Sequence, residues 1–336
     1  MQLDLRQFIA ASEQIVASHA LPTPGAYRRW NDGTVGADRD LGINPYGCAD
    51  AANILYTIGR FPSVPASRAG WVSSLQAMQD SQSGLFEEPT HHPIHTTAHC
   101  VAALELFDAR PRHALREFDA LRDVAALRAF LGGLAWRTDP WRASHRGAGL
   151  FAALAIVEAV DLAWQDAYYD WLWEWTDPDT GLLGGRDLPP IEHSGVQTLV
   201  PHMAGTFHYL FNMEWARRPY RYPSRLIDTC LALLDEDRYP LGRRISFAEI
   251  DWIFCVNRSL RQSGHRMTDC HRAIERLGRR LVDFVHSLDP RTDDALNDLH
   301  LLFGTLCALA ELQQARPGLV RTDRPLKLVL DRRPFI

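Results

Sequence analysis

The chain of 336 residues is long enough for one large domain or for two domains of ordinary size. Hydrophobic residues make up 46% of it and charged residues 23%, a globular composition with ample material for a core. The formal net charge of -5 argues against a nucleic-acid-binding protein, because such proteins usually carry a basic surface.

The N-terminal segment has the pattern of an amphipathic helix. Charged residues such as Asp4, Arg6 and Glu13 interrupt its apolar positions, so it lacks the continuous apolar core of a signal peptide. No apolar run approaches the roughly 18 residues that cross a bilayer. The six cysteines form no Cys-x-x-Cys pair, and most lie within apolar helical runs. We therefore expect a reduced, cytoplasmic protein that contacts neither a membrane nor nucleic acid.

Six apolar helical segments share one layout, in which a loop and then polar or small residues lead into the helix. They recur about every 50 residues, and a regular recurrence of this length is typical of repeat architectures. These segments lack a charged face, so we expect them to be enclosed in the fold. They are Cys48–Gly59, His95–Phe107, His145–Val157, His202–Met213, Glu249–Leu260 and Asp298–Leu312.

A more amphipathic helical segment accompanies each apolar one. These segments are Gln2–Ser18, Ala66–Asp80, Asp119–Trp136, Val160–Thr176, Pro223–Asp237 and Thr268–Leu288. The alternation predicts an all-α fold, an (α/α)6 toroid of six helical hairpins whose outer helices shield the inner ones around a central cavity. No linker divides the chain, so residues 1–336 are expected to form a single α/α-toroid domain. Residues 321–336 would then be a closing strand or an arm across one face.

The layout resembles the α/α-toroid proteins, in particular the six-hairpin glycosidase-like fold. That group includes unsaturated-glycoside hydrolases, polysaccharide lyases and sugar epimerases. A weaker resemblance points to the terpenoid-cyclase and prenyltransferase toroid. The segment Leu75–Phe86 is similar to the helix-ending glutamine-to-glycine-aromatic motif of that branch, and Trp171–Leu182 is a looser copy. The resemblance covers nearly the whole chain at the level of layout and implies a site in the central cavity.

Polar residues fall at equivalent positions near the starts of the apolar segments. In a ring of this kind, the loops that enter the inner helices converge on one mouth of the cavity. Equivalent positions in the aligned segments hold Asp50, His99, Gly149, Gly205, Asp251 and Gly304. One turn earlier stand Tyr46, His95, His145, Pro201, Phe247 and His300. The three glycines are interpreted as leaving space for something to enter between the helices.

These residue types suit general acid–base chemistry on a sugar. Glycosidic cleavage needs a carboxylic acid that protonates the leaving oxygen and a second carboxylate as base or nucleophile. Uronate lyases and epimerases instead need a base that removes a carbon-bound proton. The catalytic candidates are Asp50 and Asp251 as the acid and base, His95 and His99 for moving protons, and Glu88 as a further carboxylate. The substrate-binding candidates are Tyr46, His91, His92, Trp141, His145, Arg146, Glu192, His202, Trp252 and His300.

A metal site is a second interpretation of the same histidines. His95 and His99 are one helical turn apart, a spacing that zinc accepts. However, Thr96 stands where the zincin motif has a glutamate. Protein prenyltransferases hold zinc with an Asp-x-Cys pair, whereas the cysteine that follows Asp251 is Cys255, four residues later. We therefore expect neither a metal ion nor another cofactor.

The other catalytic patterns are weak or absent. Thr292–Ala295 offers two aspartates without the leading aspartate of the terpene-cyclase motif, and no phosphate-binding glycine loop is present. The sequence therefore predicts a carbohydrate-active enzyme, either a glycoside hydrolase or a uronate lyase or epimerase, that acts on a small saccharide at the inner-helix N-termini. The alternative is a non-catalytic toroid that binds a ligand or partner and in which the histidines only line the cavity. A prenyltransferase or terpene cyclase-like enzyme is the third candidate.

Overall fold

Helices dominate the computed structural model, which describes residues 2–31 and 39–336. The predicted all-α class is confirmed, since the strands in these ranges form only two short two-stranded ladders. The helices that match the apolar segments, here called the inner helices, are α2 (Pro45–Thr57), α4 (Pro93–Leu106), α6 (Pro140–Ile156), α8 (Val200–Trp215), α10 (Ala248–Ser263) and α12 (Leu299–Ala315). The helices that match the amphipathic segments, the outer helices, are α1 (Arg6–Ser18), α3 (Pro65–Ala77), α5 (Val124–Gly132), α7 (Leu162–Glu174), α9 (Pro223–Glu236) and α11 (Met267–Ser287). Within the described ranges, no helix combines the length and the apolar character that a membrane span requires.

The local sequence explains where the inner helices begin. Asn44 caps α2 by accepting a hydrogen bond from the backbone N–H of Tyr46, and Pro45 occupies the first helical position. Asp298 caps α12 in the same way, through the backbone N–H of His300. Nearly every side chain of these two helices is buried, as their lack of a charged face predicts.

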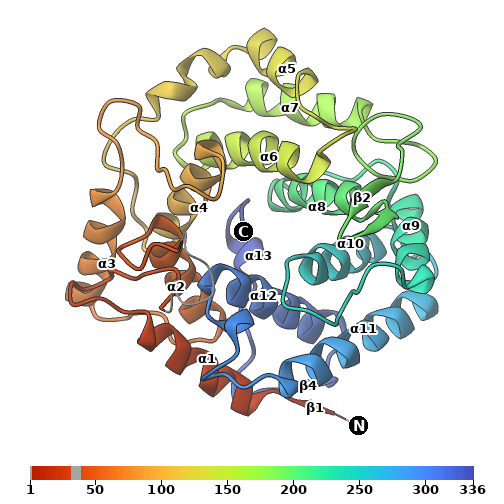
Figure 1. The fold of residues 1–336 in the computed structure, drawn as a ribbon. Helices are drawn as coiled ribbons and strands as arrows, with labels where there is room; N and C mark the ends of the chain where they lie inside the picture. Colours follow the sequence, from red (N-terminus) through yellow and green to blue (C-terminus); the bar gives the residue numbers. More distant parts are fainter. Residues whose placement is uncertain (1, 32–38) are drawn as a thin grey trace.

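The inner helices close a circuit. Helix α2 packs against α4, α4 against α6, α6 against α8, α8 against α10 and α10 against α12, and α12 returns to α2. Figure 1 shows these helices around the centre of the molecule, with the outer helices along the periphery. Helix α3 contacts both α2 and α4, and α9 and α11 contact α10. Side chains from different inner helices can therefore reach one shared interior.

One predicted helix is divided in the structure. The segment Asp119–Trp136 is expected to be a single outer helix, but it overlaps a 3-10 helix, η1 (Arg116–Arg122), and the shorter α5. The break lies at Asp123, whose backbone is extended and whose carboxylate accepts a hydrogen bond from the backbone N–H of Ala126. Asp123 therefore acts as the N-cap of a new helix instead of continuing the previous one.

The sequence does not predict the β-hairpin that precedes α8. It consists of β2 (Ile191–His193) and β3 (Val196–Thr198), which pair in antiparallel register. The turn between them holds Ser194 and Gly195, both with positive φ. A two-residue turn of this conformation matches the twist of the flanking strands and is typical of tight hairpins. The strands are too short for an alternation of apolar and polar residues to be recognised in the sequence.

The C-terminal segment first crosses the outside of the ring and then enters it. The short strand β4 (Val320–Arg321) pairs in parallel with β1 (Leu3–Asp4), next to the N-terminus. The chain then forms α13 (Val329–Arg332), which packs against α2 and α8. Figure 1 places the C-terminus at the centre of the ring of inner helices. The segment is therefore both a closing strand and part of the interior.

Hydrogen bonds hold the last four residues inside the ring. The buried guanidinium of Arg333 donates to the side-chain carbonyl of Asn53 on α2 and to the backbone carbonyl of Phe335. The side-chain amide of Asn212 on α8 donates to the backbone carbonyl of Pro334 at 2.8 Å. The tail is thus tied to opposite sides of the interior, and it fills space that the sequence interpretation leaves as cavity.

Three inner-helix glycines mark close approaches of neighbouring elements, which corrects the interpretation that they leave open space. A Cβ atom on Gly205 would lie 2.9 Å from the carbonyl oxygen of Pro140 on α6. A Cβ atom on Gly304 would lie 2.9 Å from the ring of Phe247, and one on Gly149 would touch α4 at 3.4 Å. Glycine at these positions therefore lets adjacent parts of the circuit pack closely.

We expect Phe335→Ala to lower the free energy of unfolding by about 3 kcal/mol, because it removes a large apolar side chain from a closed interior. Phe335 is fully buried, with its ring centroid 5.0 Å from that of His95 and 5.9 Å from that of Phe211. Urea unfolding measures the loss. Phe284→Ala, at a half-buried position on α11, is the control and should cost clearly less. Equal losses in the two variants would contradict tight packing of the tail.

Candidate functional site

Aromatic rings from five inner helices and one loop gather in the interior. We call this group the histidine cluster, and its members are Tyr46, His91, His95, His99, His145, His208 and His300. The ring of Tyr46 stacks against those of His91, His95 and His99, with centroids 4.4–6.0 Å apart. The centroid of His145 lies 4.3 Å from that of His95 and 4.9 Å from that of His208. All members except His208 are predicted site residues, so the structure brings six of the predicted residues together.

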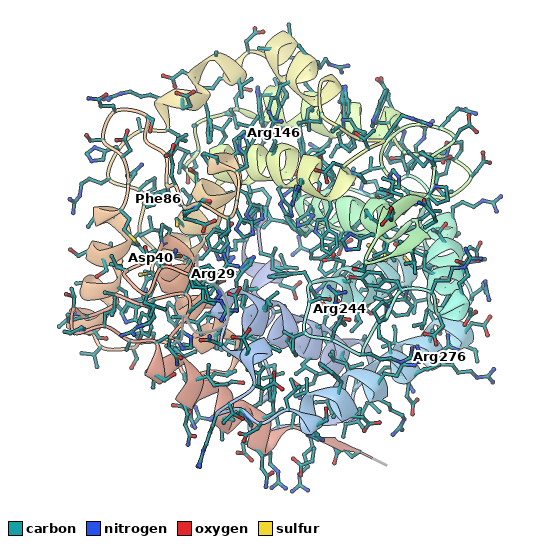
Figure 2. All side chains as sticks on the ribbon, viewed as in Figure 1. Arg29, Asp40, Phe86, Arg146, Arg244 and Arg276 are labelled. Carbon is teal, nitrogen blue, oxygen red and sulfur yellow. The ribbon has the colours of Figure 1, made fainter. Side chains whose placement is uncertain are left out.

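Helix geometry explains this convergence. His95 and His99 are one turn apart on α4, which puts both rings on one face of the helix. Tyr46 and His300 lie in the first turns of α2 and α12, and these two helices are neighbours in the circuit. Their rings meet edge to face, with centroids 4.6 Å apart. Figure 2 shows side chains that carry nitrogen atoms pointing into the centre of the ring from several inner helices.

Asp50 is a fully buried carboxylate held by two imidazoles of the histidine cluster. Its Oδ1 lies 2.8 Å from Nε2 of His99, and its Oδ2 lies 3.2 Å from Nδ1 of His300. Burial alone would raise the pKa of Asp50, but the charges and hydrogen bonds of His300 and His99 outweigh this effect and lower it well below its usual range. Nδ1 of His99 lies 2.8 Å from the main-chain oxygen of Ile336, so this imidazole links Asp50 to the C-terminal tail.

Asp251 is fully buried like Asp50, but its carboxylate lacks the hydrogen bonds that Asp50 has. Neither of its carboxylate oxygens has a hydrogen-bond partner in the described part of the chain. Burial, and then the negative charge of Glu249, raises the pKa of Asp251 well above its usual range. Burial also raises the pKa of Glu249 to about 6, although Ser246 and the backbone N–H of Gly242 donate hydrogen bonds to its carboxylate. Helix α10 therefore carries two buried carboxyl groups whose protonated forms are favoured by their surroundings.

The raised pKa of Glu249 predicts a specific pH dependence of stability. Because the folded state holds this proton more tightly than the unfolded state, stability is fully present below pH 4.5 and is lost as the pH rises through about 6. The free energy of unfolding falls by about 2 kcal/mol in total from well below pH 4.5 to well above pH 6. Urea unfolding of the wild type and of Glu249→Gln across pH 4–7 measures this loss. The difference in the free energy of unfolding between the two proteins should change by about 2 kcal/mol over this range. A constant difference would show that Glu249 titrates normally.

A group of charged residues borders the histidine cluster at the start of α4. Glu88 lies 2.9 Å from Nδ1 of His91 and accepts a hydrogen bond of 2.6 Å from Thr90. Burial opposes ionisation of Glu88, but the hydrogen bonds from His91 and Thr90 prevail and lower its pKa to about 2. Arg29 lies 3.8 Å from Glu88 and forms a bidentate pair with Asp298 at 2.8 Å. This side of the cluster therefore carries paired ionic groups.

A cavity of about 400 Å³ leads to the histidine cluster from outside. Its walls are the start of α6, the hairpin strand β2 and the start of α8, and its lining residues are Thr138, Asp139, Pro140, Trp141, Arg142, His145, Ile191, Glu192, His193 and Pro201. The rings of Trp141 and His193 lie 5.3 Å apart. Since His145 belongs both to this lining and to the cluster, a ligand in the cavity would touch the cluster directly. Three predicted substrate-binding residues, Trp141, His145 and Glu192, line it.

Four predicted substrate-binding residues lie elsewhere. The fully buried indole of Trp252 donates to the carbonyl of Cys230 on the outer helix α9, so Trp252 cannot offer a face to a sugar. The guanidinium of Arg146 lies over the ring of Phe130 on α5. His202 contacts the carbonyl of Pro189, and His92 caps α4. Trp252, Arg146 and His202 each stand one residue after an aligned position, and one residue turns a side chain by about 100° around the helix, onto another face.

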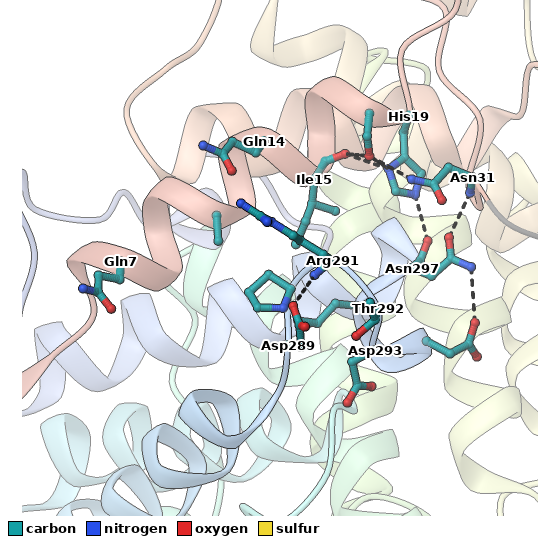
Figure 3. A pocket seen from close by; sticks show the side chains of 15 residues that line it. Gln7, Gln14, Ile15, His19, Asn31, Asp289, Arg291, Thr292, Asp293 and Asn297 are labelled. Carbon is teal, nitrogen blue, oxygen red and sulfur yellow. Dashed lines mark hydrogen bonds between the residues drawn. The ribbon is translucent and has the colours of Figure 1, made fainter.

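A larger cavity of about 790 Å³ lies away from this site (Figure 3). It is a surface cavity between α1 and the segment 289–297. One of its lining residues is His19. Its Nδ1 lies 2.7 Å from the backbone carbonyl oxygen of Ile15, and its Nε2 lies 2.8 Å from that of Asn297. The imidazole therefore connects two parts of the fold and is not available to a ligand, so the interior site is the better candidate for chemistry.

Sequence reasoning misses several residues of the site. His208 lies deeper in its helix than the aligned positions, and its only signal is a polar residue within an otherwise apolar run. Arg29 and Asp298 are far apart in the chain, and no local pattern connects them.

Two groups of three side chains have potential metal-ligand atoms within 4.8 Å of one another in the described ranges. They are His95, His145 and His208, and Asp50, His99 and His300.

Comparison with known proteins adds no family to this picture. No protein-family model matches the chain. Neither a curated protein nor a solved structure matches it. The function is therefore inferred from the geometry of the interior site.

Proposed function

We propose that this chain is an (α/α)6 toroid of six helical hairpins and a carbohydrate-active enzyme, a glycoside hydrolase or a uronate lyase or epimerase. The observation that carries the proposal is the contrast between Asp50 and Asp251, two fully buried aspartates on inner helices. The pKa of Asp50 is lowered by His300 and His99, whereas the pKa of Asp251 is raised by burial. Pairs of titratable groups with opposite shifts are typical of acid and base partners in active sites.

The two environments suggest the role of each group. Burial favours the protonated form of Asp251, which would be the acid that protonates a leaving oxygen. Asp50 is ionised and would act as a base unit with His300, fixing its orientation and stabilising the positive charge that forms when this imidazole accepts a proton. Both ring nitrogens of His99 already face oxygens, of Asp50 and of Ile336, so His99 would hold Asp50 in place and would not accept a proton. In an elimination or epimerisation His300 would remove a carbon-bound proton.

The cavity is suited to a small saccharide. Its volume of about 400 Å³ lies within the usual range for small-molecule sites. Trp141 offers an aromatic face at the mouth, Glu192 offers hydrogen-bond acceptors, and His145 leads to the histidine cluster. We propose that the ligand enters here from a reducing cytoplasm, which agrees with the six cysteines being free and buried.

The alternative is a non-catalytic toroid that binds a saccharide or another ligand. It is favoured by the complete burial of Asp50 and Asp251, since neither carboxyl group reaches the cavity surface. A prenyl-diphosphate enzyme is less well supported, because Arg146, the main candidate for binding a diphosphate at the mouth, lies over Phe130. A measurement of turnover distinguishes the carbohydrate-active enzyme from the non-catalytic toroid, because only the enzyme converts its ligand.

A thermal-shift screen tests the ligand class. Uronic acids, neutral oligosaccharides and prenyl diphosphates are added in turn to the full chain. A ligand at 100 times its dissociation constant stabilises the folded state by about 2.7 kcal/mol. We expect a saccharide to stabilise the protein and Trp141→Ala to reduce the effect, while Trp173→Ala, on the exposed face of α7, leaves it unchanged. Stabilisation by prenyl diphosphates alone would overturn the carbohydrate proposal.

A further inference from the structure

Three imidazoles from consecutive inner helices converge beside the cavity. His95 of α4, His145 of α6 and His208 of α8 each offer a ring nitrogen, and these nitrogens lie within 4.8 Å of one another. The rings of His95 and His145 are tilted by 45°, and those of His145 and His208 by 80°. Rings tilted in this way do not form a single stack, so their nitrogens can be directed to a common point.

The other nitrogens of two of these rings are already held in place. Nδ1 of His208 lies 2.9 Å from the carbonyl oxygen of Ala204, which requires a proton on Nδ1 and leaves a lone pair on Nε2. Nδ1 of His95 is hydrogen-bonded to the hydroxyl group of Tyr46. Metal-binding histidines almost always have their second ring nitrogen fixed by a partner of this kind. His95 and His208 are thus oriented as ligands would be.

His145 completes the group from the cavity side. Its contacts in the described ranges are with the rings of His91, His95 and His208, which leaves both of its ring nitrogens available. It also lines the cavity of about 400 Å³. A small molecule in the cavity can therefore approach the point on which the three rings converge.

We propose that His95, His145 and His208 bind one divalent transition-metal ion, best suited to zinc, with a fourth coordination position open to the cavity. Neutral imidazole is a preferred ligand of zinc and of neighbouring transition metals. Three protein ligands with one open position are characteristic of zinc sites that bind and activate a small molecule, whereas purely structural sites are closed by four. The site does not depend on the roles proposed for Asp50 and Asp251.

The second group of potential ligands is less suited to an ion. The oxygens of Asp50 accept hydrogen bonds from His99 and His300. The remaining ring nitrogen of His99 is hydrogen-bonded to the main-chain oxygen of Ile336. A metal ion there would have to replace these contacts, whereas the first group offers ring nitrogens that are not engaged.

Metal titration of the full chain tests the proposal. The purified protein is dialysed against a chelator and titrated with Co²⁺, whose visible spectrum reports tetrahedral coordination, and then with Zn²⁺ in equilibrium dialysis and thermal-shift measurements. We expect one equivalent of metal and a stabilisation of the wild type that grows with Zn²⁺ concentration. His208→Gln and His145→Gln should weaken binding at least about 100-fold, because each removes one of three ligands.

Two further variants keep the proposal falsifiable even if a ligand variant folds poorly. Tyr46→Phe removes only the partner of His95, and we expect it to weaken metal binding about 10- to 100-fold. His300→Gln, in the second group, should retain one equivalent with unchanged affinity. Absence of metal binding in the wild type, unchanged binding in His208→Gln, or loss of the ion in His300→Gln would each overturn the assignment.

Discussion

Replacing Asp50 by asparagine is expected to reduce the turnover of a saccharide by about 100- to 10,000-fold. Asparagine preserves the shape of the side chain but removes the negative charge that faces His99 and His300. The imidazole of His300 would then lose both its fixed orientation and the stabilisation of the charge formed during proton transfer. The loss should appear in kcat with little change in KM, because Asp50 does not line the cavity.

Asp228→Asn is the matched control for this variant. Asp228 is a partly exposed aspartate on the outer helix α9, paired with His265 and Arg266. It has no contact with the histidine cluster, so its variant should turn over substrate at the wild-type rate. An Asp50→Asn protein that folds normally and retains full turnover would remove Asp50 from the proposed mechanism.

Arg258→Met is expected to lower the free energy of unfolding by about 3–5 kcal/mol, because breaking a buried ion pair leaves an uncompensated charge. Arg258 on α10 forms a bidentate pair with Glu311 on α12, with both hydrogen bonds at 2.8 Å. It also lies 2.7 Å from Asp331 of α13 and 3.8 Å from Glu214 of α8. One guanidinium thus connects three inner helices to the C-terminal segment.

The double variant Arg258→Met, Glu311→Leu distinguishes loss of charge balance from loss of packing. Replacing both members of a buried ion pair with apolar residues is often neutral or stabilising. We expect the double variant to recover much of the stability lost in Arg258→Met, as measured by urea unfolding. If the loss in the double variant equals the sum of the losses in Arg258→Met and in Glu311→Leu measured singly, the pair is not energetically coupled and the effect of Arg258 arises elsewhere.

The sequence predicts the inner helices well because each has an apolar body and all except α10 begin with a capping residue or a proline. Asn44 followed by Pro45, and Asp298 before α12, are recognisable caps, and the segments that follow lack a charged face. The break at Asp123 is harder to predict, because an aspartate within a helical pattern becomes a cap only if the backbone there is extended. The path of the C-terminal tail depends on contacts with distant residues such as Asn53 and Asn212, which no local pattern reveals.

The site is predicted only in part, for a similar reason. Equivalent positions along the repeated helices correctly bring together Tyr46, His95, His145 and His300. Trp252 stands one residue after the aligned Asp251, which turns it about 100° around the helix, and it faces the outer helix α9. The pairing of Arg29 with Asp298 and the position of His208 follow from packing between helices far apart in the chain.

The most direct test of the proposed function is product analysis by mass spectrometry. The wild type and Asp251→Asn are incubated with a panel of oligosaccharides, with and without uronic acid residues. We predict that the wild type converts at least one of them, by addition of water to a cleaved bond, by formation of an unsaturated uronate or by epimerisation. Asp251→Asn should be at least about 100-fold slower. A protein that binds saccharides but converts none of them would contradict the catalytic proposal and indicate a binding toroid.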